Sequence, residues 1–371
     1  MIGDSATRYG FALPLMIAFL SLLEGPRSRA LTAAIVVVFV ASCGNPENSE
    51  SPNRSAPTSS ENDPARANPG AKSRAVVVRV LDVGQGDATL IENGGSRVLI
   101  DGGPEASRLG VLLDSLGLNG TTIDAVILSH SHADHLIGLR ELFDSRRRIA
   151  IRYFFENGDP SPAANLRHLR DSIGARVARR ELVFRRTDDP CANGGPICTL
   201  TMKGGAKIEV MRPMPGHANP NNRSTPVKLI GSDSASFTMW FAGDAEQEEI
   251  AWFLGEAHYD ENPGMRATIL KADHHGSCNG VTSAYLDAIQ PAMVTASVGA
   301  ANSYHHMHTQ AQEAYRAKGI VWYRTDENGT ITITSPGTPG GKFSVRPQRG
   351  GPNLSGQSDS RSTQAMCNPI P

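Results

Sequence analysis

The chain has 371 residues, of which 39% are hydrophobic and 20% are charged. This is enough for one large domain of about 250 residues with a tail at each end, a size common for mixed α/β folds. The formal net charge of -1 at pH 7 argues against a protein that binds nucleic acid through bulk positive charge.

The N-terminal region, residues 1–43, has the order of an export signal. Arg27 and Arg29 precede an apolar stretch, 30–40, which ends in Val40-Ala41-Ser42-Cys43. This order predicts a secretory signal with a lipobox, in which Cys43 becomes the acylated first residue of an exported lipoprotein anchored in a membrane. An earlier apolar run, 11–23, leaves a two-helix membrane anchor as the weaker alternative, because neither run reaches the roughly 20 apolar residues of a spanning helix.

Two segments lack the apolar residues that a core requires. Residues 44–75 are rich in Ser, Pro, Asn and Ala, and residues 336–371 are rich in Gly, Pro, Ser and Gln. We expect both to be disordered, as a linker before the domain and a tail after it. The folded domain is therefore expected at residues 76–335.

The pattern of the folded part changes along the chain. Its first half is rich in strands, predicted at 76–81, 89–92, 97–100, 123–128, 151–155, 207–211, 227–230 and 237–241, with helices at 106–116, 136–143 and 163–173. Its second half alternates helices at 246–254, 283–289 and 309–318 with strands at 268–271, 293–297, 321–323 and 331–334. The order predicts a mixed α/β (α+β) fold in which two mixed sheets pack face to face with helices outside.

Eight of the 11 histidines fall into three clusters, 130/132/135, 274/275 and 305/306/308, and each cluster directly follows a predicted strand. Imidazole and carboxylate groups are ligands of zinc and its neighbours, and the four ligands of His130-x-His132-x-Asp134-His135 cannot all reach one ion without strain. Asp244 follows another strand and can offer an oxygen to each of two cations; alternatively it caps the helix that begins near Glu246. The pattern predicts a dinuclear metal site at the carboxyl ends of strands.

Four cysteines remain besides Cys43. Cys191 and Cys198 bracket a Gly-Gly-Pro turn, which predicts a disulfide in an exported protein. Cys278 and Cys367 form the other predicted pair.

Several motifs resemble those of the metallo-β-lactamase superfamily. The segment His130-x-His132-x-Asp134-His135 looks like the signature of that fold, and Val-Leu-Ile-Asp-Gly-Gly at 98–103 resembles its first motif. Within the superfamily, the chain most resembles the soluble hydrolase domain of ComEC-type competence (DNA internalisation) proteins. The shared motifs are Asp-Val-Gly-Gln-Gly-Asp-Ala at 82–88, Gly-Asp at 243–244, Lys-x-x-His-His-Gly-Ser at 271–277, an altered Asn-Ser-Tyr-His-His-Met at 302–307 and Arg-Thr-Asp-x-x-Gly at 324–329. The resemblance covers residues 76–334 and implies a four-layer αββα sandwich.

The resemblance also implies a ligand set for two divalent ions, zinc or manganese. One ion would be held by His130, His132 and a histidine of the 274/275 pair, with His275 preferred to His274 and with His217 as a further alternative. The other would be held by Asp134, His135 and His306, with Asp244 between the two ions. Asp101 would support the metal loop from behind. Candidates for the substrate rim are Gln85, Asp87, Ser277 and Tyr304, although loop capping explains Asp87 and Ser277 equally well.

The implied reaction is hydrolysis of a phosphodiester, with DNA as a candidate substrate. Two divalent ions would lower the pKa of a bridging water from 15.7 toward about 7, and Asp134 could orient that nucleophile. One alternative is a hydrolase of small phosphoesters, similar to exported phosphorylcholine esterases. Another is a non-catalytic module that binds DNA or a cell-wall component, if the altered turn at 305–307 has lost the second metal. Hydrolysis of a β-lactam or lactone is disfavoured by the Lys-x-x-His-His-Gly-Ser motif.

Overall fold

The computed structural model describes residues 73–192, 194–233, 236–261 and 264–367. The predicted signal segment with Cys43, and the linker up to residue 72, lie outside the described residues. In the part that is described, the helices are too short or too polar to cross a bilayer.

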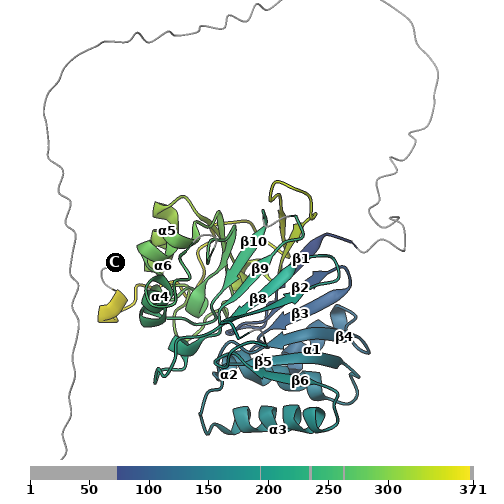
Figure 1. Cartoon of the computed structure of the whole chain (residues 1–371). Coiled ribbons are helices and arrows are strands. Elements are labelled where there is room, and N and C mark those ends of the chain that lie inside the picture. The colour runs from purple at the N-terminus through teal and green to yellow at the C-terminus, as the bar shows by residue number, and fades with distance from the viewer. Residues whose placement is uncertain (1–72, 193, 234–235, 262–263, 368–371) are drawn as a thin grey trace, which may run out of the picture. The chain divides into compact units, whose positions relative to one another are not determined.

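Two mixed sheets form the centre of the domain (Figure 1). In spatial order, the eight-stranded sheet contains β15 (Ser344–Pro347), β14 (Ile331–Ser335), β1 (Val76–Val80), β2 (Thr89–Asn93), β3 (Ser96–Ile100), β4 (Thr122–Ile127), β5 (Ala150–Glu156) and β6 (Val183–Arg186). The seven-stranded sheet contains β13 (Val321–Arg324), β12 (Met293–Ala296), β11 (Ile269–Lys271), β10 (Thr238–Phe241), β9 (Val227–Ile230), β8 (Lys207–Met211) and β7 (Ile197–Thr201).

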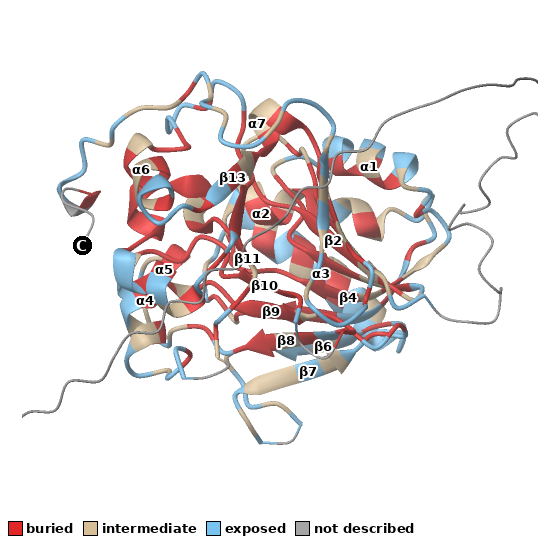
Figure 2. Ribbon diagram, turned by 90° about the horizontal axis from the view of Figure 1, so that it is seen from above, coloured by how far each residue is buried: buried red, intermediate tan, exposed pale blue. Residues whose placement is uncertain are grey.

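Helices cover the outer face of each sheet. The α-helices are α1 (Ala106–Ser115), α2 (Ala133–Leu136), α3 (Ala164–Ala178), α4 (Gln247–Leu254), α5 (Ser283–Ile289), α6 (Thr309–Ala317) and α7 (Thr325–Asn328). Short 3-10 helices lie at η2 (Ile137–Phe143), η3 (Asn221–Arg223), η4 (Asp273–Gly276), η5 (Cys278–Gly280) and η6 (Ala365–Cys367). Figure 2 shows buried strands in the middle of the domain and exposed residues on the outward sides of the helices.

Three hydrophobic clusters account for the layers. One lies between the sheets and contains Val78 and Ile127 from one sheet and Leu229 and Met239 from the other. A second joins α1, η2 and α3 to the eight-stranded sheet, and a third joins α4, α5 and α6 to the seven-stranded sheet. Burial of both faces of a sheet requires a partner layer on each side. The predicted four-layer αββα sandwich is therefore confirmed.

Parallel strands bring the polar strand ends to one edge. β3, β4, β5 and β6 pair in parallel in one sheet, and β10, β11, β12 and β13 do so in the other. The segments that follow β4, β10, β11 and β12 carry the predicted ligands. Because parallel strands end at the same edge, these four segments meet there.

The sequence pattern missed the edge strands β6 and β7. Most β6 residues are exposed, and β7 alternates between exposed and half-buried residues. A strand that buries neither face fully carries little hydrophobic periodicity. Its pairing with a neighbour, rather than its own sequence, makes it a strand.

The expectation that residues 336–371 are disordered is wrong for the described part of this segment. β15 pairs antiparallel with β14 and extends the larger sheet. Further on, Asp359 pairs with the fully buried Arg324 of β13, and the Thr309 amide of α6 donates to the Ser360 carbonyl. The segment is poor in apolar residues, but polar and ionic contacts with the domain order it.

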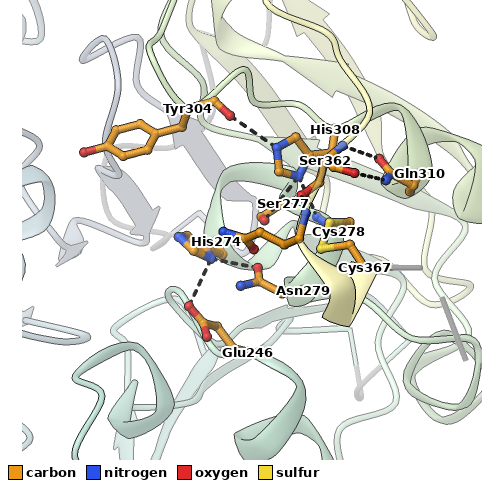
Figure 3. Close-up of a disulfide and its surroundings, with 11 residues drawn as sticks. Glu246, His274, Ser277, Cys278, Asn279, Tyr304, His308, Gln310, Ser362 and Cys367 are labelled. Atoms are coloured by element: carbon orange, nitrogen blue, oxygen red, sulfur yellow. Dashed lines mark hydrogen bonds and ion pairs between the residues drawn. A yellow bond between two sulfur atoms is a disulfide. The ribbon is translucent and has the colours of Figure 1, made fainter. Parts of the chain in front are cut away.

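Both predicted disulfides are present. Cys191, in the loop before β7, is bonded to Cys198 within that strand. Cys278, in the loop after β11, is bonded to Cys367 near the end of the described chain. The second bond ties the C-terminal segment to the loop that carries His274 and His275 (Figure 3).

Candidate metal centre

The predicted metal loop follows β4 directly. The chain leaves the strand at Ile127 and enters the short helix α2 at Ala133. This turn directs His130 and His135, both fully buried, toward Asp244, which follows β10. The metal loop also requires a glycine at position 86, because a Cβ atom there would lie 2.2 Å from the Asp134 carbonyl oxygen. The motif at 82–88 thus packs against the backbone of the metal loop.

Three groups of side chains among the described residues have the arrangement of metal ligands, and two of them contain Asp244. In one group Asp134, His135, Asp244 and His275 offer donor atoms that all lie within 4.8 Å of one another. In the other group His130, His132 and Asp244 do the same. These two groups share Asp244, whose carboxylate can serve one cation with each oxygen.

Unpaired polar atoms show that this donor set fits divalent cations. His130 Nε2 and Asp244 Oδ1 are buried and have no hydrogen-bond partner in the described part of the chain. Leaving such atoms unpaired is costly, and coordination of a cation would satisfy them. Imidazole nitrogen with carboxylate oxygen suits zinc, manganese or iron.

Asp101 fixes the orientation of His135 from behind. Its carboxylate accepts hydrogen bonds from the Ser129 amide (2.8 Å) and the Ser129 hydroxyl (2.7 Å), and it lies 2.9 Å from His135 Nδ1. A proton on Nδ1 leaves Nε2 of the neutral ring free to bind a cation. His135 Nε2 lies 3.2 Å from Asp244 Oδ2. The predicted supporting role of Asp101 agrees with this geometry.

His275, rather than His274, faces the carboxylates. His275 Nδ1 lies 2.9 Å from the Ser297 carbonyl oxygen, while its Nε2 lies 3.2 Å from Asp134 and 3.3 Å from Asp244. His274 instead lies 2.9 Å from Asn279 Oδ1 and 3.4 Å from Glu246 Oε1 (Figure 3). The preference for His275 over His274 is consistent with these contacts.

The pKa shifts describe a centre in which buried carboxylates face imidazoles. Burial lowers the pKa of His130 well below its usual value, so this ring is neutral. Burial alone would also lower the pKa of His135 and of His275, but Asp244 and neighbouring carboxylates raise both well above the usual value. Bound cations would replace the positive charge of these two rings, and their binding would release protons.

The structure groups the ligands differently from the expected assignment. His275 belongs with Asp134 and His135, not with His130 and His132. His306 enters neither group, and its ring centroid is 6.0 Å from that of His275. His217 also stays outside, because its Nδ1 accepts a hydrogen bond from the Asn219 amide.

Asp244 does not cap the following helix. The N-cap of α4 is Glu246, and its side chain makes no capping hydrogen bond. The Asp244 amide donates to Ser224 Oγ at 3.0 Å, while the carboxylate faces His135 and His275. Of the two expected roles of Asp244, helix cap and shared metal ligand, the geometry is consistent with the second.

Of the four rim candidates, only Tyr304 is exposed. Its side chain is 63% exposed and its ring stacks on His306 with centroids 5.7 Å apart. Asp87 is buried and accepts a hydrogen bond from Lys271 Nζ at 2.8 Å. Ser277 is buried beside His308, and Gln85 accepts a hydrogen bond from the Gly299 amide. These three residues hold the loops behind the ligands rather than forming a rim.

Sequence reasoning missed three polar residues beside the centre. Ser131 donates to Asp159, and Asp159 lies 3.8 Å from Arg223. Asp159 follows β5, so the rule that polar residues after parallel strands gather at one edge could have found it. Arg223 carries no such signal, because it lies after a long irregular loop.

The comparisons with known proteins agree with this architecture. The sequence model of the Metallo-beta-lactamase superfamily matches residues 81–152, which span β2 to β5 and include the metal loop. This part of the chain is therefore similar to the metallo-beta-lactamase superfamily. The predicted resemblance is thereby confirmed.

Curated relatives of this chain support the ComEC-type resemblance. ComE operon protein 3 of Bacillus subtilis (strain 168) is 29% identical over 290 residues, covering 73% of this chain and 34% of that protein. Competence protein ComA of Neisseria gonorrhoeae is 25% identical over 256 residues, covering 68% of this chain and 31% of that protein. The chain therefore spans about a third of the length of these relatives.

Among solved structures, the metallo-beta-lactamase fold protein YhfI from Bacillus subtilis aligns with a TM-score of 0.43 and 16% identity, covering 67% of this chain and 95% of that chain. The short form of human tRNase Z aligns with a TM-score of 0.36 and 14% identity, covering 59% of this chain and 91% of that chain.

Proposed function

We propose that this protein is an exported phosphodiesterase that uses two divalent metal ions, and that its substrate is DNA. The observation that carries the proposal is the pair of ligand groups that share Asp244. A site with two cations suits the displacement of an oxygen at phosphorus, where both the attacking and the leaving oxygen need stabilisation.

The relatives favour DNA as the substrate. One of them is named a competence protein, and competence is the uptake of DNA. Another is named as a product of the ComE operon. This chain matches only about a third of each relative, so the activity is proposed for the metal-binding domain alone.

The side chains of the site have separate tasks in this proposal. His130, His132 and Asp244 would hold one cation, and Asp134, His135, His275 and Asp244 the other. When bound, the cations supply Lewis acidity, which lowers the pKa of water and offsets the charge of a phosphoryl group. The Asp134 side chain is 30% exposed, so its carboxylate can also orient the attacking water.

Export has independent support from the cysteines. Two disulfides occur in the described residues, and disulfides persist mainly in oxidising compartments outside the cytosol. The proposed lipidation of Cys43 and membrane attachment are tested by palmitate labelling of the wild type and Cys43→Ala. Equal labelling of the two proteins would contradict the lipoprotein assignment.

One observation favours a non-catalytic binding module as a second candidate. His306 lies outside both ligand groups, and only three protein donors surround the position at His130 and His132. If a single metal were retained, the domain could hold DNA or a cell-wall component without cleaving it. An open coordination position is, however, also typical of catalytic sites.

The decisive experiment uses the full chain loaded with manganese or zinc. We expect about two metals per chain by elemental analysis, and metal-dependent cleavage of bis(p-nitrophenyl) phosphate and of single- or double-stranded DNA. Asp134→Ala should lower the cleavage rate by at least about 100-fold, because it removes a donor and the group that orients water. Full activity in this variant would refute the mechanism, and metal binding without cleavage of any phosphoester would favour the binding module.

A matched control distinguishes the loss of a candidate metal ligand from the loss of a negative charge elsewhere in the domain. Asp144→Ala removes an aspartate that pairs with the exposed Arg146 and whose side chain is 22% exposed. It should retain metal and activity like the wild type. Equal losses in Asp144→Ala and Asp134→Ala would indicate a nonspecific effect on folding.

A further inference from the structure

Hydrogen bonds hold the backbone at Arg223 close to the candidate metal centre. Its carbonyl oxygen accepts a hydrogen bond from Asn157 Nδ2 at 2.6 Å. The next residue, Ser224, accepts through Oγ from the amide of the shared ligand Asp244. Thr225 then donates its amide to the carbonyl of Ser129, which precedes His130. These three consecutive residues are therefore hydrogen-bonded to the segments that follow β5, β10 and β4.

The guanidinium of Arg223 is largely buried but poorly paired. Its side chain is 13% exposed, and Nε is buried without a hydrogen-bond partner. Nη1 lies 3.8 Å from Asp159 Oδ1, which is too far for a hydrogen bond. A guanidinium has five donors in a planar fork, and leaving them unsatisfied away from water is unfavourable.

Two other cations near the centre are hydrogen-bonded to protein partners. Arg170 donates to both carboxylate oxygens of Glu156 and to the Asp159 carbonyl. Lys271 donates to Asp87 and to the Ala272 carbonyl. Arg223 differs from both because its buried Nε has no hydrogen-bond partner among the described residues.

The partner that orients Arg223 also contacts the metal loop. Asp159 accepts a hydrogen bond from the hydroxyl of Ser131. Ser131 stands between His130 and His132 in the sequence. The chain of contacts from Arg223 through Asp159 to Ser131 therefore places the guanidinium on the side of the centre formed by His130 and His132. That ligand group has three protein donors, so it has room for an oxygen of a substrate.

We propose that Arg223 forms a phosphate-binding subsite beside the His130 and His132 group. Its fork would donate to the non-bridging oxygens of a phosphodiester, while Asp159 holds the side chain in place. Arginine suits this task because its planar donors match two oxygens of one phosphate. The proposal rests on the proposed function and deepens it: the centre would select phosphate esters over uncharged esters.

Phosphate binding and selectivity test this subsite on the metal-loaded full chain. Inorganic phosphate is titrated calorimetrically into the wild type, Arg223→Gln and Arg223→Lys. We expect about 10- to 100-fold weaker binding in Arg223→Gln, the usual effect of losing a charged hydrogen bond, and a smaller loss in Arg223→Lys, which keeps the charge but not the fork. Metal content and thermal unfolding of each variant check that the centre and fold are intact.

Hydrolysis gives a second readout. KM for bis(p-nitrophenyl) phosphate should rise in Arg223→Gln by a similar factor, while kcat/KM for uncharged p-nitrophenyl acetate stays unchanged. Arg146→Gln is the matched control, because it removes the same charge from a side chain that is 86% exposed. It should behave like the wild type in both assays.

The outcomes separate the subsite from the proposed function. Wild-type phosphate affinity in Arg223→Gln, an equal loss in Arg146→Gln, or no phosphate binding by the wild type would overturn the subsite. If Arg223→Gln loses phosphate binding but the wild type cleaves no phosphodiester, the subsite stands and the proposed activity fails. If Arg223→Gln does not fold, Arg223→Lys alone decides, and unchanged affinity and KM in that variant would contradict recognition by the fork.

Discussion

At the scale of single residues, the centre depends on groups that do not themselves face a metal. Asp101 lies behind His135 and accepts three contacts, two from Ser129 and one from His135 Nδ1. Its φ of 58° places it in the left-handed region, which costs a non-glycine residue roughly 1 kcal/mol or more. This unfavourable backbone conformation occurs at the residue whose carboxylate orients His135.

This arrangement predicts that Asp101→Asn weakens metal binding without removing a ligand. The amide group can accept through only one of its two terminal atoms, so it cannot accept from both the Ser129 amide and His135 Nδ1, which contact different oxygens of the Asp101 carboxylate. We expect about 10- to 100-fold lower metal affinity, as is typical when such a supporting carboxylate is lost, measured by competition with a chelator. The control is Asp124→Asn in the neighbouring strand β4, whose carboxylate accepts a hydrogen bond from the Arg97 amide. Equal affinities in the two variants would contradict this role of Asp101.

At the scale of elements, the loop after β11 joins the centre to the C-terminal segment. His275 and Cys278 lie three positions apart in this loop, and Cys278 is bonded to Cys367, 89 residues further on. The Cys278 amide also donates to His308 Nδ1. The disulfide therefore fixes a loop that carries a ligand and closes a long segment of chain. Cys191 and Cys198 are separated by only seven positions in the sequence.

We predict that Cys278→Ser with Cys367→Ser destabilises the protein more than Cys191→Ser with Cys198→Ser. In the chain-entropy description, a loop of about 100 residues contributes about 4.7 kcal/mol and a short loop much less. Urea denaturation of the two double variants measures the difference in the free energy of unfolding. The first variant should also lose metal more readily on dialysis. A larger loss in the second variant would show that native contacts, rather than loop closure, dominate.

Local patterns account for most elements but not for the edge strands. Alternating or continuous apolar residues mark β1 and β4, which are buried, and the pattern predicted both to within about two residues. β6 and β15 have mostly exposed or half-buried side chains. Pairing with β5 and β14 makes them strands, and such pairing leaves no periodic signal in the sequence.

At the scale of the whole molecule, the C-terminal segment is part of the domain. The Arg324 side chain is fully buried and pairs with Asp326 of α7 at 2.7 Å and with Asp359 of the C-terminal segment. Asn353 accepts a hydrogen bond from the Trp322 amide in the same strand. Polar residues order this segment because they pair with a buried charge, on Arg324, and with a backbone amide of β13, that of Trp322. A fragment that ends near residue 340 would lose these contacts.

We predict that Asp359→Asn lowers the free energy of unfolding by about 1–3 kcal/mol, because it removes one of the two carboxylates that compensate a buried guanidinium. The control is Glu313→Gln, which breaks the ion pair between Glu313 and Arg361. The Glu313 side chain is 44% exposed and the Arg361 side chain is 59% exposed. Exposed pairs contribute about 0–1 kcal/mol. Urea denaturation measures both variants. A disordered tail would instead leave the stability of Asp359→Asn unchanged.

The sequence by itself determined the candidate ligand types, their places after strands, the two-sheet architecture and the Cys191–Cys198 pair. These features are encoded locally, in apolar periodicity and in short motifs such as His130-x-His132-x-Asp134-His135. Only the tertiary structure decided that His275 joins Asp134 and His135, that His306 stays outside, that the C-terminal segment is ordered, and that Arg223 lies beside the metal loop. Each of these depends on distances between residues far apart in the chain, which are set by how two sheets pack and not by any local pattern.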